Sequence, residues 1–253
     1  MADEPIAHPA AAAAPAESEA LDPLRRTFRD SIAEPAEVLD ALRAREAALL
    51  LIDLQNLCAA QGVGVFGEAA PAEATPAAQS YYFQSLAATA LPNARRLLET
   101  FRRHRLEVVH TRIQSLTPNG RDRSPGHKRL GLHAAPGSRE AEFLAPVAPA
   151  AGEIVINKTA SGVFSATNLE YVLRNLGVRA LFVAGVYTNE CVSTAVRDGS
   201  DLGFHMTLVQ DACTTVTPEL HSATIRTLRD RYARVLRTAA AIREIERLVA
   251  REG

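Results

Sequence analysis

The chain has 253 residues, of which 47% are hydrophobic and 23% charged, and its formal net charge is −1. This composition is ordinary for a globular protein, and the near-zero charge gives no reason to expect nucleic acid or an anionic membrane as a partner. No apolar run approaches the roughly 20 residues of a membrane-spanning helix and no signal peptide is recognisable, so we expect a cytoplasmic protein.

The first 45 residues differ in composition from the rest of the chain. Residues 1–20 are acidic and rich in Ala and Pro, which predicts an arm that is disordered or wrapped on a neighbouring subunit. Residues 22–45 contain short helical patterns interrupted by Pro35. We therefore divide the chain into an N-terminal arm, residues 1–45, and one domain, residues 46–250.

Within this domain, apolar runs typical of buried strands alternate with helical patterns. The predicted strands are residues 47–56, 106–112, 152–158, 179–186, 204–213 and 232–237. The predicted helices are residues 92–105, 165–178, a segment that begins at Cys191, 218–231 and 239–252. Such alternation predicts a three-layer α/β/α fold with a six-stranded, mainly parallel, Rossmann-like sheet.

Three reactive side chains follow or end strands of this predicted sheet. Asp53 lies in the first strand segment, Lys158 ends the third strand, and Cys191 follows the fourth. In parallel sheets ligands bind at the carboxyl ends of the strands, so an acid, an amine and a thiol are expected at one edge.

These groups suit nucleophilic catalysis. A helix N-terminus and a nearby ammonium both stabilise a thiolate, so Cys191 is expected to be a nucleophile with a pKa below the ordinary value of about 8.5. Asp53 can take the thiol proton and return it to a leaving amine, as attack on an amide carbonyl through a thioester requires.

Structural roles remain open for each group when only the spacing is considered. A lone cysteine is often a small buried hydrophobe, an aspartate after a strand often caps a turn, and a lysine there is often a solvated charge. The other two cysteines, Cys58 and Cys213, are widely spaced and form neither a disulfide framework nor a CxxC metal pair.

Three segments resemble the signature blocks of the isochorismatase-like cysteine hydrolases, in the same order and at similar spacing. They are LLLIDLQN (49–56), VINKTASGVFSATNLEYVL (155–173) and VAGVYTNECVSTAVRDGSDLGFHMTLVQDAC (183–213). The resemblance implies that Asp53 is the general acid/base, Lys158 its charge partner and Cys191 the nucleophile. It also implies a cis peptide bond between Val186 and Tyr187, in a turn whose N–H groups, with that of Cys191, form an oxyanion hole.

The resemblance also narrows the chemistry. True isochorismatases lack the cysteine, so Cys191 implies hydrolysis of a C–N bond, and the segments DLQNLC (53–58) and ECVSTAVRDGSDLGF (190–204) look closest to biuret, triuret and ureidoacrylate amidohydrolases. The metal-binding Asp-x-His of nicotinamidases has no counterpart here. We therefore treat His127 and His133 as loop residues and expect neither a metal nor a cofactor.

Five further residues are candidates for substrate contact by their position. Gln55 and Asn56 could bind urea-type N–H and C=O groups or cap a turn. Tyr187 and Phe164 could wall the pocket, although core packing is an equal possibility for Phe164, and Arg112 ends the second strand facing either the pocket or solvent.

One departure from the family pattern concerns the loop before the last strand. Biuret hydrolases carry a substrate-binding Gln there, whereas this chain has Arg231 or Tyr232 at that position. Because Arg binds carboxylates through two parallel hydrogen bonds, Arg231 suggests a substrate with a carboxylate, such as an N-carbamoyl amino acid; a surface Arg is the alternative.

The sequence therefore predicts an amidohydrolase for a small urea-like compound that releases ammonia or an amine. Alternatives are an N-carbamoyl amino acid amidohydrolase and a non-catalytic ligand-binding protein with the same fold. The resemblance also implies a homodimer or homotetramer, with the small-molecule substrate as the only other partner.

Overall fold

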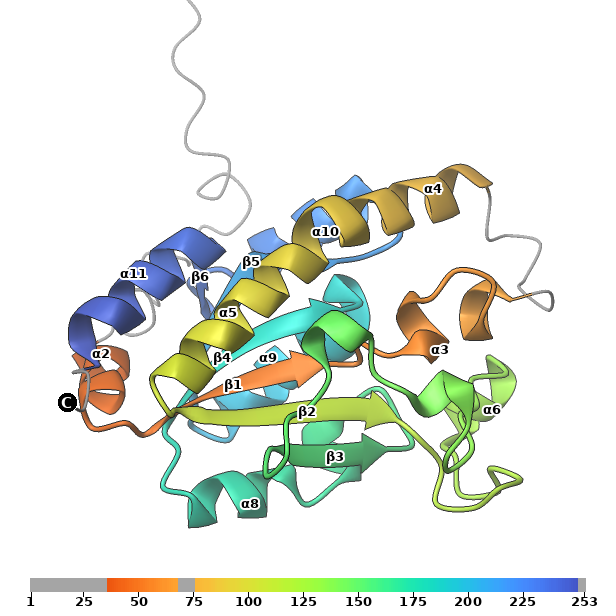
Figure 1. The fold of residues 1–253 in the computed structure, drawn as a ribbon, viewed down its shortest axis with the longest axis horizontal. Helices are drawn as coiled ribbons and strands as arrows, with labels where there is room; N and C mark the ends of the chain where they lie inside the picture. Colours follow the sequence, from red (N-terminus) through yellow and green to blue (C-terminus); the bar gives the residue numbers. More distant parts are fainter. Residues whose placement is uncertain (1–35, 68–75, 250–253) are drawn as a thin grey trace, which may run out of the picture.

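The computed structural model describes residues 36–67 and 76–249 (Figure 1). The described helices, short turns (η) and strands, in chain order, are α2 (Ala36–Arg43), β1 (Ala47–Ile52), α3 (Asn56–Ala59), η1 (Gly64–Phe66), α4 (Pro76–Ser85), η2 (Leu86–Ala90), α5 (Leu91–Arg103), β2 (Glu107–Ile113), α6 (Pro125–Arg129), η3 (Arg139–Ala141), η4 (Ala145–Val147), β3 (Ile154–Lys158), α7 (Val163–Ala166), α8 (Leu169–Asn175), β4 (Ala180–Val186), η5 (Thr188–Val192), α9 (Ser193–Asp201), β5 (His205–Thr214), α10 (Pro218–Leu228), β6 (Arg234–Leu236) and α11 (Thr238–Leu248).

The six strands form one sheet in the order β3-β2-β1-β4-β5-β6, and every pairing is parallel. This confirms the predicted fold class. The chain first moves from β1 toward β3 and then crosses back to β4, so the direction of winding changes between β1 and β4. A crevice at the carboxyl ends of these two strands is where such sheets bind ligands.

Helices cover both faces of the sheet. Because crossovers between parallel strands are right-handed, α5 lies on one face together with α11 and α2, while α8, α9 and α10 lie on the other (Figure 1). All residues of β1 and β4 are buried as a result, which explains why these segments read as continuous apolar runs. Among the described residues, no helix is long and apolar enough to span a membrane.

Helix α2 lies within the residues that the sequence assigned to the N-terminal arm. Residues 36–43 form α2, whose Val38, Ala41 and Leu42 are buried against the core. Helix α2 contacts β1, β4 and α11, so it is a part of the domain. The remaining residues assigned to the arm, 1–35, lie outside the described residues.

Candidate active site

The three reactive side chains at the carboxyl edge of the sheet are in contact. The ammonium of Lys158 lies between the other two, with its Nζ 2.8 Å from Asp53 Oδ2 and 3.3 Å from Cys191 Sγ. All three residues are buried, with Cys191 the most exposed at 5%. The sheet thus brings Asp53 into contact with residues more than a hundred positions later in the sequence.

Neighbouring strands hold the acid and the amine in place. Thr111, on β2, donates a hydrogen bond from its hydroxyl to Asp53 Oδ1 at 3.0 Å, and its carbonyl accepts one from the Asp53 N–H. Lys158 Nζ also donates a hydrogen bond to the carbonyl of Ala160 at 3.0 Å. The Asp53–Lys158 pair therefore has fixed partners on both sides.

The cysteine lies in the turn that joins β4 to α9. The Val186–Tyr187 peptide bond is cis, as the resemblance implied. At Glu190 the backbone leaves the helical region, with φ −118° and ψ −105°, and Cys191 then begins the approach to α9. The described geometry therefore agrees with a thiol close to a helix N-terminus.

Side chains from two other elements anchor this turn. The Thr188 hydroxyl and His221 Nδ1, on α10, are 2.9 Å apart, and the Thr215 hydroxyl donates to Asn189 Oδ1. Ser193 donates to the Asn189 carbonyl at 3.3 Å. The cysteine turn is thus tied to α10 and to the residue that follows β5, as well as to its own strand.

Electrostatics at the site favour a protonated thiol in the free protein. Burial raises the pKa of Cys191 to about 12; the Lys158 charge opposes this shift, and the Asp53 carboxylate adds to it. Burial lowers the pKa of Lys158, but the charge of Asp53, its hydrogen bond to Lys158 and the nearby cysteines together outweigh burial and leave that pKa above its ordinary value. The pKa of Cys191 therefore lies above the ordinary value instead of below it as expected, because burial outweighs the opposing charge of Lys158.

Cys58, on α3, is close enough for Asp53 and Cys191 to raise its pKa, although burial is the larger cause. Its carbonyl accepts hydrogen bonds from the hydroxyls of Tyr82 and Tyr187, both at 2.8 Å. The rings of these tyrosines lie 5.2 Å apart between centroids. Tyr187 thus links the cysteine turn to α3 and α4, while its ring is half-buried.

Gln55 is fully buried and its amide has structural partners. Its Nε2 donates to the carbonyls of Ile113 and Glu140, both at 2.9 Å, and its Oε1 accepts from the Ile113 N–H at 2.6 Å. Since both of its N–H groups are used, Gln55 connects the ends of β1 and β2 and has no free donor for a substrate. Gln55 therefore has a structural role, which the sequence left open as the alternative to substrate contact.

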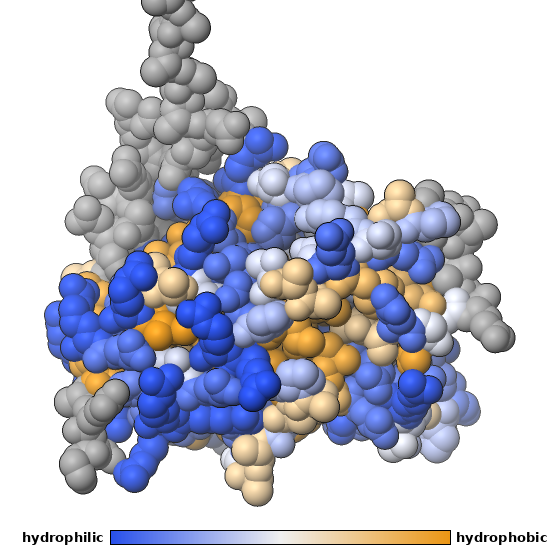
Figure 2. Space-filling model, turned by 45° about the horizontal axis from the view of Figure 1, so that its top comes forward, coloured by the Kyte–Doolittle hydropathy of each residue, from blue (hydrophilic) through white to orange (hydrophobic). Residues whose placement is uncertain are grey.

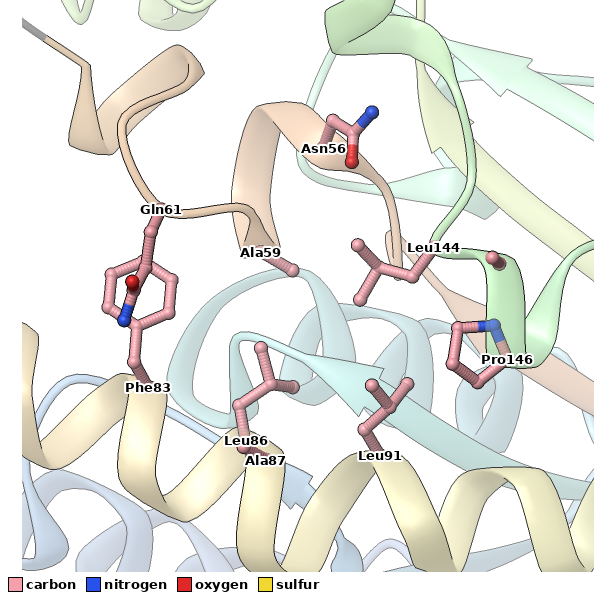
Figure 3. Close-up of a pocket in the computed structure, with 10 residues that line it drawn as sticks. Asn56, Ala59, Gln61, Phe83, Leu86, Ala87, Leu91, Leu144 and Pro146 are labelled. Atoms are coloured by element: carbon pink, nitrogen blue, oxygen red, sulfur yellow. The ribbon is translucent and has the colours of Figure 1, made fainter.

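Asn56 donates from Nδ2 to the Arg139 carbonyl at 2.9 Å and lines a pocket of about 300 Å³ (Figure 3). The other lining residues are Ala59, Gln61, Phe83, Leu86, Ala87, Leu91, Leu144, Ala145 and Pro146. Leucines from η2, α5 and the segment before η4 converge on it (Figure 3), and apolar surface bordered by hydrophilic residues is exposed on this side of the molecule (Figure 2). None of Asp53, Lys158 and Cys191 lines this pocket.

Two other candidates face away from the reactive groups. In β2, Thr111 faces Asp53, so the next residue, Arg112, points to the opposite face of the sheet. Arg112 donates to Asn157 Oδ1 at 2.7 Å and to the Ala141 carbonyl at 3.0 Å. Phe164 is 8% exposed and stacks on Phe204, so it packs in the core.

The predicted role of Arg231 in binding a substrate carboxylate is not supported by its position. It precedes β6, and because all strands are parallel, the start of β6 lies at the amino edge of the sheet. In register, Arg234 of β6 pairs with Thr207 near the start of β5. Arg231 stacks on the Tyr232 ring there, 4.7 Å from its centroid, at the edge opposite Cys191.

One residue near the reactive groups was not predicted from the sequence. His127, treated as a loop residue, lies in α6 and is 2% exposed. It is close enough to Lys158 and Asp53 for both charges to act on its pKa. A lone histidine in a long loop carries no local signal for this placement. Within residues 36–67 and 76–249, no group of three or more His, Cys, Asp or Glu side chains is placed to hold a metal ion.

Comparison with known proteins identifies the family of the domain. Residues 47–240 match the isochorismatase domain. The chain belongs to the isochorismatase family. It is therefore a hydrolase, as the sequence predicted.

The relatives of this chain include proteins that are named as amidohydrolases. The ureidoacrylate amidohydrolase RutB of Variovorax paradoxus is 27% identical over 74% of this chain and 74% of its own. The maleamate amidohydrolase of Pseudomonas putida is 28% identical over 56% of this chain and 67% of its own. An isochorismatase family protein from Desulfovibrio vulgaris subsp. vulgaris superposes with a TM-score of 0.64 at 26% identity, covering 78% of this chain and 96% of that one.

Proposed function

We propose that this family member is a cysteine-dependent amidohydrolase that cleaves a C–N amide bond of a small urea-like compound and releases ammonia or an amine. The observation that carries the proposal is the buried contact of Lys158 with both Asp53 and Cys191. A thiol, a proton acceptor and a fixed positive charge are the groups that amide hydrolysis through a thioester needs. Two of the amidohydrolases among the relatives support the same reaction class.

In the proposed reaction, the proton of Cys191 moves to Asp53 as Sγ attacks the substrate carbonyl. The raised pKa of the thiol, caused mainly by burial, means that this transfer accompanies attack and does not precede it. The N–H groups of the turn at Tyr187 and Cys191 would stabilise the oxyanion. Asp53 then returns the proton to the leaving nitrogen, and water hydrolyses the thioester with Asp53 as base.

Lys158 would hold its positive charge beside Asp53 while the thiol proton is transferred. Its ammonium is buried and hydrogen-bonded to the Ala160 carbonyl, so it stays in place throughout the cycle. Arg231 lies at the far edge of the sheet, so it gives no support to an N-carbamoyl amino acid as the substrate.

The test is ammonia release from biuret, triuret, ureidoacrylate, N-carbamoyl amino acids, nicotinamide and maleamate, with wild type beside Cys191→Ala. We expect turnover of at least one compound, abolished in Cys191→Ala, and a thioester visible by mass spectrometry of quenched reactions. Absence of turnover across the panel, with Cys191 no more reactive than Cys58 and Cys213, would support the non-catalytic alternative.

The assembly and location of the protein remain predictions of the resemblance and the composition. We propose a homodimer or homotetramer, which sedimentation of the full chain would reveal as two or four times the mass of one chain. A cytoplasmic location agrees with the three free cysteines, Cys58, Cys191 and Cys213.

A further inference from the structure

His127 is a buried side chain whose polar atoms have no partner. Its residue is 2% exposed, and neither Nδ1 nor Nε2 has a hydrogen-bond partner among the residues that the structure describes. Leaving buried polar atoms unpaired costs about 1–3 kcal/mol each, so such atoms call for an explanation. The backbone of the residue, in contrast, is well satisfied, since its N–H donates to the Ser124 hydroxyl.

The ring lies beside the reactive groups. The N–H of Ser124, the residue that caps α6, donates to the carbonyl of Thr159 at 2.9 Å, so α6 is fastened next to Lys158. The charged groups that act on the His127 ring are Lys158, Asp53 and Arg123. Helix α6 lies at the carboxyl edge of β2 and β3, the edge that carries Lys158 (Figure 1).

The ring is uncharged at neutral pH. Burial, and then the positive charge of Lys158, lower the pKa of His127 to about 4, while Asp53 opposes the shift. A neutral imidazole carries one N–H donor and one acceptor nitrogen. Carboxamide and urea groups carry a carbonyl acceptor and N–H donors, so they offer partners for both ring nitrogens, whereas a carboxylate offers only acceptors.

We propose that His127 is a substrate-binding residue that recognises an uncharged carboxamide or urea group next to the scissile bond, donating to its carbonyl and accepting from its N–H. This inference rests on the proposed amidohydrolase function and names the group that its site selects. The unpaired nitrogens are explained because their partners arrive with the substrate.

Labelling of Cys191 tests the proposal without requiring turnover. Iodoacetamide carries a carboxamide next to the carbon that the thiol attacks, whereas methyl methanethiosulfonate carries none. The rate of labelling at Cys191 is measured for both reagents by peptide mass spectrometry, in wild type and in His127→Leu, His127→Gln and His104→Gln. His104 is a control because it is also buried but follows α5, at the amino edge of the sheet.

We expect the ratio of the iodoacetamide rate to the methyl methanethiosulfonate rate to fall about tenfold or more in His127→Leu, as loss of a hydrogen bond to an otherwise buried group predicts. His127→Gln should retain most of the ratio, since its amide can donate and accept. His104→Gln should leave the ratio unchanged. For any compound that wild type hydrolyses, KM should rise about tenfold in His127→Leu, with kcat within about twofold.

Thermal melting separates binding from a structural role. Leucine has a similar volume and removes two unpaired polar atoms, so His127→Leu should melt at or above the wild-type temperature. An unchanged reagent ratio, with or without a lower melting temperature, would overturn the proposal. Wild-type turnover of a panel compound, with the ratio of labelling rates unchanged in His127→Leu, would contradict only the His127 proposal. A lowered ratio of labelling rates without turnover of any compound would contradict only the amidohydrolase function.

Discussion

At the scale of single residues, the proposed chemistry depends on one shared cation. Lys158 contacts Asp53 at 2.8 Å and Cys191 at 3.3 Å, inside a site from which water is largely excluded. The charge of Lys158 alone does not offset the burial that raises the pKa of the thiol. In the proposed reaction, deprotonation of Cys191 therefore depends on Asp53.

This balance predicts how the free thiol reacts with pH. Because the pKa of Cys191 is raised to about 12 by burial, the thiolate fraction grows tenfold per pH unit across the measurable range. Iodoacetamide labelling of Cys191 should accelerate about tenfold per unit from about pH 7 to 10, without a plateau. A plateau below about pH 8 would show instead that the free protein holds a stable thiolate.

The same ion pair has a predictable effect on stability. Lys158→Met leaves the buried carboxylate of Asp53 without its counter-charge, which should reduce the free energy of unfolding by about 3–5 kcal/mol. The double variant Asp53→Asn with Lys158→Met removes both charges and should recover much of this loss, although it is inactive. Chemical denaturation measures the free energy of unfolding of wild type, the single variant and the double variant. Equal losses of this free energy in the single and double variants would contradict a coupled pair.

At the scale of elements, the site depends on how closely β1 and β4 approach. Gly185, in β4, pairs with Ile52 and has φ +129°, a conformation that favours glycine. A Cβ atom at this position would lie 2.1 Å from the Ile52 carbonyl oxygen. The register between β4 and β5 shifts at the same point, so the end of β4 bends just before the cysteine turn.

Gly185→Ala should therefore disrupt both stability and activity. We expect a loss of about 3 kcal/mol or more, because backbone atoms cannot move away from the new methyl group. Gly177→Ala is a matched control, since Gly177 also has a positive φ but nothing within 4 Å of an added Cβ, and it should cost only about 1 kcal/mol. Similar melting temperatures for the two variants would mean that the close approach does not matter.

At the scale of the whole molecule, the two edges of the sheet have different tasks. The reactive groups gather at the carboxyl edge. Nearer the amino edge, Glu153 joins Arg102 at 2.7 Å and His110 at 2.9 Å, which ties α5 to β2 and to the start of β3. Arg234 pairs in a similar way with Glu244 at 2.8 Å and joins β6 to α11. Stability and chemistry can therefore be changed separately.

Glu153→Gln should test this separation. Burial alone would raise the pKa of Glu153, but hydrogen bonds from Arg102, the Ala150 N–H and His110 outweigh it and lower the pKa to about 2. A depressed pKa stabilises the fold above the unfolded value of about 4.3, and this contribution is lost as the pH falls toward the folded value. The variant should melt below wild type at neutral pH, with the gap narrowing below about pH 4.3, and its kcat should be unchanged.

The exposed pair of Arg95 and Glu99 provides the control for that experiment. Both side chains are at least half exposed, so Glu99→Gln should change the melting temperature little at any pH. A difference in melting temperature between wild type and Glu153→Gln that stays constant down to acidic pH would argue against a carboxylate whose ionisation is linked to folding.

Local patterns were sufficient for much of the fold and for the three reactive residues. The strands β1 and β4 are continuous apolar runs because helices cover both faces, and that burial is visible in the sequence. The sequence alone indicated the proximity of Asp53, Lys158 and Cys191, because parallel strands all present their carboxyl ends at one edge of the sheet. The resemblance of three short blocks to one family pointed to the same residues and to the cis bond before Tyr187.

Contacts between distant segments could be decided only by the tertiary structure. The partners of Gln55 lie at Ile113 and Glu140, so its amide is occupied although its position after β1 suggested a substrate contact. Arg231 lies at the far edge because α10 carries the chain back across the sheet before β6 begins. His127 comes beside Lys158 through the fold of a long loop, and the burial that raises the pKa of Cys191 is the summed effect of groups from every layer. The hydrophobic periodicity of a segment indicates which of its faces is buried. The pairing of strands, the sheet edge at which a residue lies and the desolvation of its side chain depend on the folded chain.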